Sequence, residues 1–142
     1  MKDDRLRVSI EDTYVHALGL ATYCFAMLEW NVVWCCEKIA PGSINCLADK
    51  TAGNIARQFI KIVTAMVPSA DQVALHTAAT DFKALVETRN GIMHGKPGTD
   101  VDGGQRLFRD GAVWTADRLN DAADRFTECS SRLNAMLYGF LA

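Results

Sequence analysis

Apolar residues recur every three or four positions along most of the 142-residue chain, and this period predicts helices. Four are expected, at about residues 10–40, 50–67, 69–94 and 116–142. Pro41 and Pro68 stop the first two, because proline interrupts the hydrogen-bond ladder of a helix. Ser69 precedes Gln72 by three residues, the spacing of a capping box at the start of a helix. Four helices with short connections predict an all-α, up-down four-helix bundle in a single domain, residues 1–142.

A small β-hairpin is expected between the third and fourth helices. The segment RLFRDGAVWT, residues 106–115, has two short apolar runs around Asp110-Gly111, a strong signal for a two-residue turn. Residues 95–104, just before it, have the composition of a polar linker. The fourth helix carries an apolar seam with alternating steps of three and four, which indicates bundle packing and suits a partner helix. That seam consists of Leu119, Ala122, Phe126, Cys129, Leu133, Met136 and Phe140.

The composition indicates a soluble globular protein. Apolar residues make up 49% and charged residues 23% of the chain, and the formal net charge is -2. The chain has no lysine-rich run, so it lacks the broad electrostatic footprint of a nucleic-acid protein, and any RNA contact would be local. The five cysteines include no CxxC pair, so neither a metal site nor another cofactor is predicted. Unpaired cysteines also favour a reducing, cytoplasmic location.

One segment, residues 18–36, has the length and apolar character of a membrane span. Glu29 and Asn31 lie in its second half, where a charged side chain is costly in lipid, and no basic flank marks a cytoplasmic side. The pattern therefore favours a central, mostly buried helix and no membrane. The charged N-terminal sequence predicts no signal peptide.

The candidate chemistry lies in ETRNGIMHGKPGTD, residues 87–100, at the end of the third predicted helix. Arg89 falls on the apolar seam of that helix and should face inward. Asn90 and His94 are four residues apart and therefore share a helix face. The sequence thus predicts a site at the rim of the core, at the C-terminal end of this helix.

These three residue types are a minimal set for cleaving RNA without a metal. An arginine grips phosphate through two parallel hydrogen bonds and stabilises the charge that builds on it. A histidine titrates near neutrality and can deprotonate the ribose 2′-hydroxyl, which then attacks the adjacent phosphate. An asparagine can orient the histidine or bind a phosphate oxygen. One histidine supplies one acid/base group, so a two-fold dimer would complete the set.

The segment Arg89-Asn90-Gly91-Ile92-Met93-His94 resembles the Arg-x(4-6)-His motif of HEPN (higher eukaryotes and prokaryotes nucleotide-binding) domains. The resemblance implies a helical homodimer in which both motifs meet in one cleft. It also implies a metal-independent endoribonuclease of a toxin–antitoxin or defence system, with RNA as substrate and an antitoxin protein as partner. Gly91 departs from a good helix former within the motif and is expected to loosen the turn that carries His94.

Other interpretations of the same residues remain open. Arg89 can form a structural ion pair with Glu29, the lone charge within the apolar run of the first helix. His94 can simply end a helix. Lys96 is the expected substrate-binding cation, and Arg106 and Arg109 either guide phosphate as well or are surface charges.

Two other functions also fit the pattern. The first is a non-catalytic bundle that dimerises or binds a partner through its apolar helical faces. The second is nucleotide binding without turnover. In either of these the three tryptophans, Trp30, Trp34 and Trp114, serve as core or interface anchors, as they do in the nuclease.

Overall fold

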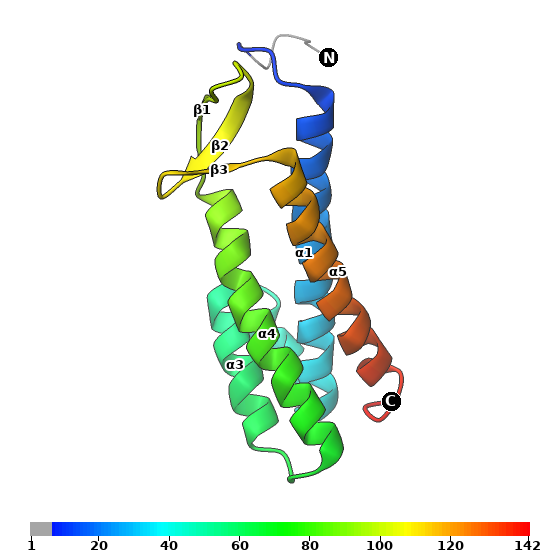
Figure 1. Cartoon of the computed structure of the whole chain (residues 1–142). Helices are drawn as coiled ribbons and strands as arrows, with labels where there is room; N and C mark the ends of the chain where they lie inside the picture. The colour runs from blue at the N-terminus through cyan, green and yellow to red at the C-terminus, as the bar shows by residue number, and fades with distance from the viewer. Residues whose placement is uncertain (1–6) are drawn as a thin grey trace, which may run out of the picture.

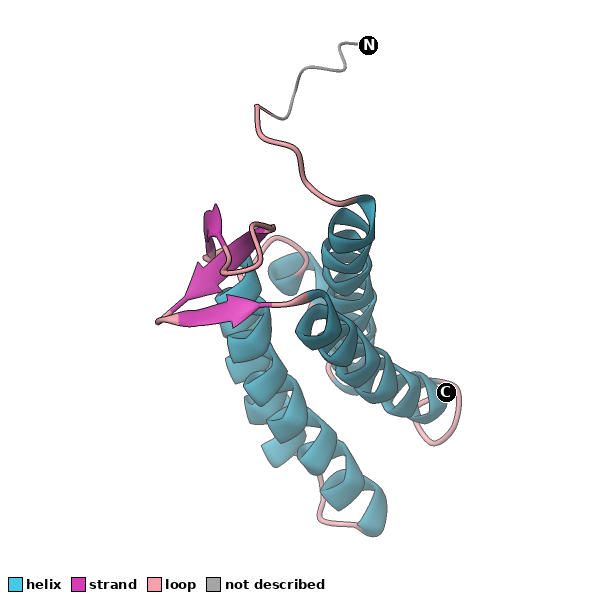
Figure 2. Ribbon diagram, turned by 45° about the horizontal axis from the view of Figure 1, so that its top comes forward, coloured by secondary structure: helices cyan, strands magenta, loops and turns pink. Residues whose placement is uncertain are grey.

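The computed structural model describes residues 7–142 and is mainly helical, with one small antiparallel sheet (Figure 1). The helices are α1 (Asp12–Ile39), α2 (Ile44–Leu47), α3 (Ala52–Thr64), α4 (Ala70–Met93) and α5 (Ala116–Leu137). The strands are β1 (Lys96–Thr99), β2 (Gln105–Arg109) and β3 (Ala112–Trp114). The sheet lies at one end of the long helices, over the C-terminal end of α4 (Figure 2).

The four predicted helices are present as α1, α3, α4 and α5, with ends that shift by a few residues. The starts of α3, α4 and α5 are fixed locally, because side-chain oxygens satisfy amides that have no partner within the helix. Ser69 accepts a hydrogen bond from the amide of Gln72, as the capping box predicts. The hydroxyl of Thr115 does the same for α5. The one-turn helix α2 was not predicted.

The helices do not alternate in direction as predicted. Tyr14 bonds to the carbonyl of Trp114, and Asn31 bonds to Ser130, so residue numbers rise together along α1 and α5 and the two helices are parallel. By contrast, α3 and α4 are antiparallel, and so are α4 and α5 (Figure 1). The prediction of an up-down order is therefore wrong. The reason is the segment of residues 40–51, whose short helix α2 carries the chain back before α3 begins.

The core forms where α1, α4 and α5 meet. The ring of Phe25 lies 6.0 Å from that of Phe82 and 5.1 Å from that of Phe126, in an edge-on arrangement with the latter. The predicted seam of α5 is buried from Leu119 to Leu133 and packs against this core. It is therefore not available to a partner helix.

The predicted hairpin is present and belongs to a larger sheet. Asp110 and Gly111 both adopt positive φ, 52° and 77°, as a two-residue turn between twisted strands requires. The stretch predicted as a linker supplies a third strand, in which Lys96 pairs with Phe108 and Thr99 with Gln105. The strand order is β1-β2-β3, so β1 is an edge strand.

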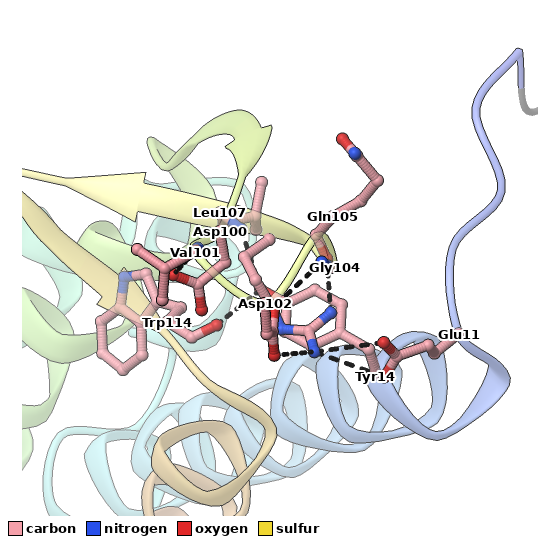
Figure 3. Close-up of polar contacts among 10 residues, drawn as sticks. Glu11, Tyr14, Asp100, Val101, Asp102, Gly104, Gln105, Leu107 and Trp114 are labelled. Carbon is pink, nitrogen blue, oxygen red and sulfur yellow. Dashed lines mark hydrogen bonds and ion pairs between the residues drawn. The ribbon is translucent and has the colours of Figure 1, made fainter.

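The sheet is fixed to α1 through one buried hydroxyl. Tyr14 donates to the carbonyl of Trp114 at 2.8 Å and accepts from the amide of Leu107 at 2.9 Å (Figure 3). The guanidinium of Arg106 lies 4.8 Å from the centre of the Tyr14 ring and pairs with Glu11 at 3.3 Å. A two- or three-stranded sheet needs such support, because it buries little apolar surface of its own.

The sequence predicts that α1 is mostly buried, and this prediction is wrong. It has the length and composition of a membrane-spanning helix, which core helices of soluble proteins share. One face is buried against α5 and α3, whereas large apolar side chains on the other face are exposed. This helix is therefore apolar on both sides, and among residues 7–142 only one side has a partner.

Replacing Tyr14 by Phe removes both hydrogen bonds and leaves a buried carbonyl and an amide without their partner. We expect Tyr14→Phe to lower the free energy of unfolding by about 2 kcal/mol, because an unsatisfied buried polar group costs about 1–3 kcal/mol. The exposed Tyr138 at the end of α5 provides the control, and Tyr138→Phe should change the free energy by less than about 0.5 kcal/mol. Urea unfolding followed by circular dichroism measures both, and equal effects would contradict the anchoring role.

Candidate active site at the end of α4

The sheet holds the end of α4 in place through two close approaches to glycine. The indole N–H of Trp114 donates to the carbonyl of Gly91 at 2.9 Å, and a Cβ at Gly91 would lie 3.0 Å from the indole ring. A Cβ at Gly95 would lie 2.9 Å from the Cβ of Leu107. The prediction that Gly91 loosens this turn is therefore wrong, since this glycine lets the ring of Trp114 pack against the helix.

Arg89 is half-buried, and its side chain crosses from α4 towards α1. Its Nη1 donates to the side-chain oxygen of Asn90 at 3.1 Å, and its guanidinium carbon lies 5.6 Å from the centre of the Phe25 ring. Asn90 is half-buried as well and thus orients the arginine. One edge of the guanidinium is held in this way, and the remaining N–H groups can bind an anion.

Glu29 and Arg89 line a small pocket of about 120 Å³ between α1 and α4. Apolar walls surround them, including Phe25, Ile92 and Met93. Within residues 7–142 the two charged side chains form no ion pair at 4.0 Å or less, so the predicted Arg89–Glu29 pair is not made directly. Burial of the carboxyl raises the pKa of Glu29 above the ordinary 4.5, and the positive charge of Arg89 lowers it by less.

His94 caps the C-terminus of α4 and is exposed. Its amide donates to the carbonyl of Asn90 at 2.9 Å, which places the two residues one turn apart, and the imidazole is open to solvent. It does not line the pocket that holds Glu29 and Arg89. The structure thus brings Arg89 and Asn90 into contact and leaves His94 on the surface beside them.

The neighbouring cations are not equivalent. Arg109 donates to the carbonyl of His94 at 3.3 Å, and the exposed Lys96 follows two residues after His94 at the start of β1. Arg106 points elsewhere, because Glu11 and Asp102 both bind its guanidinium. Of the three cations considered from the sequence, Lys96 and Arg109 lie near the motif and Arg106 serves the sheet.

Three of the five cysteines, Cys35, Cys36 and Cys129, are buried. Burial raises the pKa of the Cys35 and Cys36 thiols to about 12 and that of Cys129 to about 11, so these thiols stay protonated and inert. Across residues 7–142, no three His, Cys, Asp or Glu side chains gather as a metal site requires.

Sequence reasoning missed the support that the sheet gives to the motif. The signal for it was present, because Gly91 and Gly95 are four residues apart and mark two close approaches on one side of a helix end. The contact between Arg109 and the carbonyl of His94 could not be predicted from the sequence, because it depends on the register of the sheet.

No family model matches the chain, and neither a curated protein nor a solved structure matches it. Function is therefore inferred from the geometry of the motif and from the resemblance of its residues to the HEPN pattern.

The raised pKa of Glu29 predicts a specific dependence of stability on pH. A carboxyl whose pKa is higher in the folded state binds its proton more tightly in that state. Its contribution to the free energy of unfolding is therefore complete below pH 4.5 and is lost as the pH rises through the folded-state pKa. We expect Glu29→Gln, which is neutral at every pH, to gain stability relative to the native protein as the pH rises from acid to neutral. Urea unfolding across this range measures the difference, and a constant difference would contradict the shift.

Proposed function

We propose that the chain is a HEPN-like, metal-independent endoribonuclease of the cytoplasm, acting as a toxin or defence component. One observation carries this proposal: Arg89 is half-buried and bonded to Asn90, one helical turn from an exposed histidine, His94. A half-buried cation without an ion-pair partner among the described residues suits an anionic ligand. A guanidinium binds phosphate through two parallel hydrogen bonds.

The proposed reaction is transfer of a phosphoryl group within the RNA. His94 takes the proton of a ribose 2′-hydroxyl, and the 2′-oxygen attacks the adjacent phosphorus. The bond from phosphorus to the 5′-oxygen breaks, which leaves a 2′,3′-cyclic phosphate and a 5′-hydroxyl. Arg89 stabilises the charge on the phosphorane oxygens, and Asn90 holds the guanidinium in position.

The leaving 5′-oxygen needs a proton, and each chain supplies one histidine in the motif. In the proposed homodimer, the imidazole of the second copy gives that proton. We further propose that the four long helices form a HEPN-like four-helix bundle whose parallel α1 and α5 distinguish it from a simple up-down order. An antitoxin protein is the partner that this function implies.

The motif variants test the proposal directly. We expect Arg89→Ala and His94→Ala each to slow RNA cleavage in the presence of a chelator by at least about 100-fold, because an acid/base group alone contributes about 10²–10⁴-fold. Arg89→Lys should also be impaired, since lysine keeps the charge and loses the planar fork. The assay follows cleavage of a labelled RNA and of the same sequence with 2′-deoxyribose, which should stay intact.

Two matched controls separate the site from the surface. His76 is exposed on α4 well before the motif, and Arg125 is exposed on α5, so His76→Ala and Arg125→Ala should cleave at the native rate. Circular dichroism confirms that each variant is folded. If the native protein cleaves no RNA, or if the His94→Ala protein cleaves as fast as the native one, the nuclease proposal fails.

The two cations near His94 should contribute to binding and not to chemistry. Both cations lie near His94 and are proposed to contact phosphate, so we expect Lys96→Ala and Arg109→Ala to raise KM several-fold with kcat nearly unchanged. Each should also reduce the salt dependence of RNA binding by roughly one counterion. Arg106→Ala serves as the contrast, because that guanidinium is bound to Glu11 and should affect stability instead.

The exposed apolar face of α1 favours a second candidate function, a non-catalytic module for dimerisation or partner binding. Under that function the motif variants would bind RNA no differently from the native protein. Nucleotide binding without turnover would appear as saturable binding of a mononucleotide that Arg89→Ala abolishes.

A further inference from the structure

The helix α1 presents a row of large apolar side chains to solvent. Leu20 is 42% exposed, Tyr23 66%, Met27 52%, Trp30 48% and Trp34 38%. We call these five residues the α1 stripe. Their spacing alternates in steps of three and four along two heptads, which is the spacing of an a/d seam in a coiled coil. Trp30 and Trp34 also contact each other edge-on, with ring centres 6.1 Å apart.

The α1 stripe lies opposite the face that α1 buries within its own chain. Each residue turns the helix by about 100°, so Met27 and Trp34 lie on the far side from Phe25 and Val32. The exposed face of α5 carries Asp, Glu, Arg and Asn residues, as expected for a surface helix. A helix that is apolar on both faces needs a partner on each.

We infer that the α1 stripe is the surface through which two copies of this chain associate. This goes beyond the proposed function, because it stands on the exposed face of α1 and not on catalysis. An a/d seam is self-complementary, so an antiparallel second α1 related by a two-fold axis fits it. In such a pair Met27 of one copy faces Trp30 of the other, and Tyr23 faces Trp34.

The size and residue types of the stripe suit a protein interface. Its exposed area is on the order of 500 Å² per chain, since a whole aromatic side chain carries about 150–250 Å². A specific interface buries about 800 Å² per partner, so the stripe forms the apolar centre and flanking positions of α1 form the rim. Aromatic residues and methionine are enriched at such centres. The formal charge of -2 per chain adds little repulsion between copies.

A lipid surface fits the stripe less well. From Leu20 to Trp34 the helix rises about 21 Å, short of the roughly 30 Å of a bilayer core. Helices that lie on a membrane carry Lys and Arg beside their apolar face, whereas α1 has only Lys38, at its end. The opposite face of α1 is already committed to α5.

The stripe is separate from the candidate site. Phe25 and Glu29 line the pocket of Arg89, and each is two residues from Met27, which is about 200° around the helix. The inference therefore concerns the association of two copies and not the chemistry of the motif.

Charged substitutions in the stripe test the inference. Tyr23→Glu and Met27→Glu alter its two most exposed residues, so the fold of each chain should survive. We expect the native chain to sediment as a dimer and each variant as a monomer, with the dimer dissociation constant raised at least about 100-fold, because an unpaired carboxylate would be buried in the seam. Val73, equally exposed on α4, supplies the control, and Val73→Glu should remain a dimer.

The competing outcomes are distinct. A native chain that is monomeric by sedimentation at every concentration, or a Met27→Glu dimer of native strength, would overturn the inference. Binding of a monomeric native chain to vesicles of anionic phospholipid, lost in Met27→Glu, would assign the stripe to a membrane instead. A native dimer that cleaves no RNA would leave this inference intact while the nuclease proposal fails.

Discussion

The close approach of Trp114 to Gly91 is the contact on which the rest of this end of the molecule depends. The indole ring occupies the space that any side chain at residue 91 would need, and its N–H satisfies the carbonyl of that glycine. The carbonyl of Trp114 in turn accepts from Tyr14 of α1. One residue of β3 thus joins α1, α4 and the sheet, and it fixes the helix end that carries Arg89, Asn90 and His94.

The sequence was sufficient for features that are decided locally. Periodicity and capping residues define the long helices, and Asp110-Gly111 defines the hairpin turn. The sequence did not reveal that α1 and α5 are parallel. A loop that simply joins two antiparallel helices and a segment that carries the chain back have similar compositions. Only the burial of Leu47 in the structure shows that α2 packs against the helices. Strand β1 was also hidden, since Pro97 and Gly98 are poor strand formers that an edge strand tolerates.

For the site, the sequence indicated which residues approach one another but not how they interact. The seam of α4 correctly directed Arg89 inward, and the lone charge within the apolar run of α1 indicated Glu29 as its neighbour. A direct ion pair did not follow, because the guanidinium contacts Asn90 and the ring of Phe25 instead. Such a choice among partners a few ångströms apart depends on packing, and a long flexible side chain gives no sign of it in sequence.

Two separate features of the molecule lead to the same requirement. The motif supplies one imidazole per chain, whereas the proposed reaction must both remove and donate a proton. The helix α1 has two apolar faces, whereas the described part of the chain covers only one of them. The first concerns chemistry and the second concerns solvation, and neither depends on the other. A second copy seated on the α1 stripe would satisfy the second, whereas the first requires in addition that an imidazole reach the end of α4, which Trp114 and Tyr14 hold beside the start of α1.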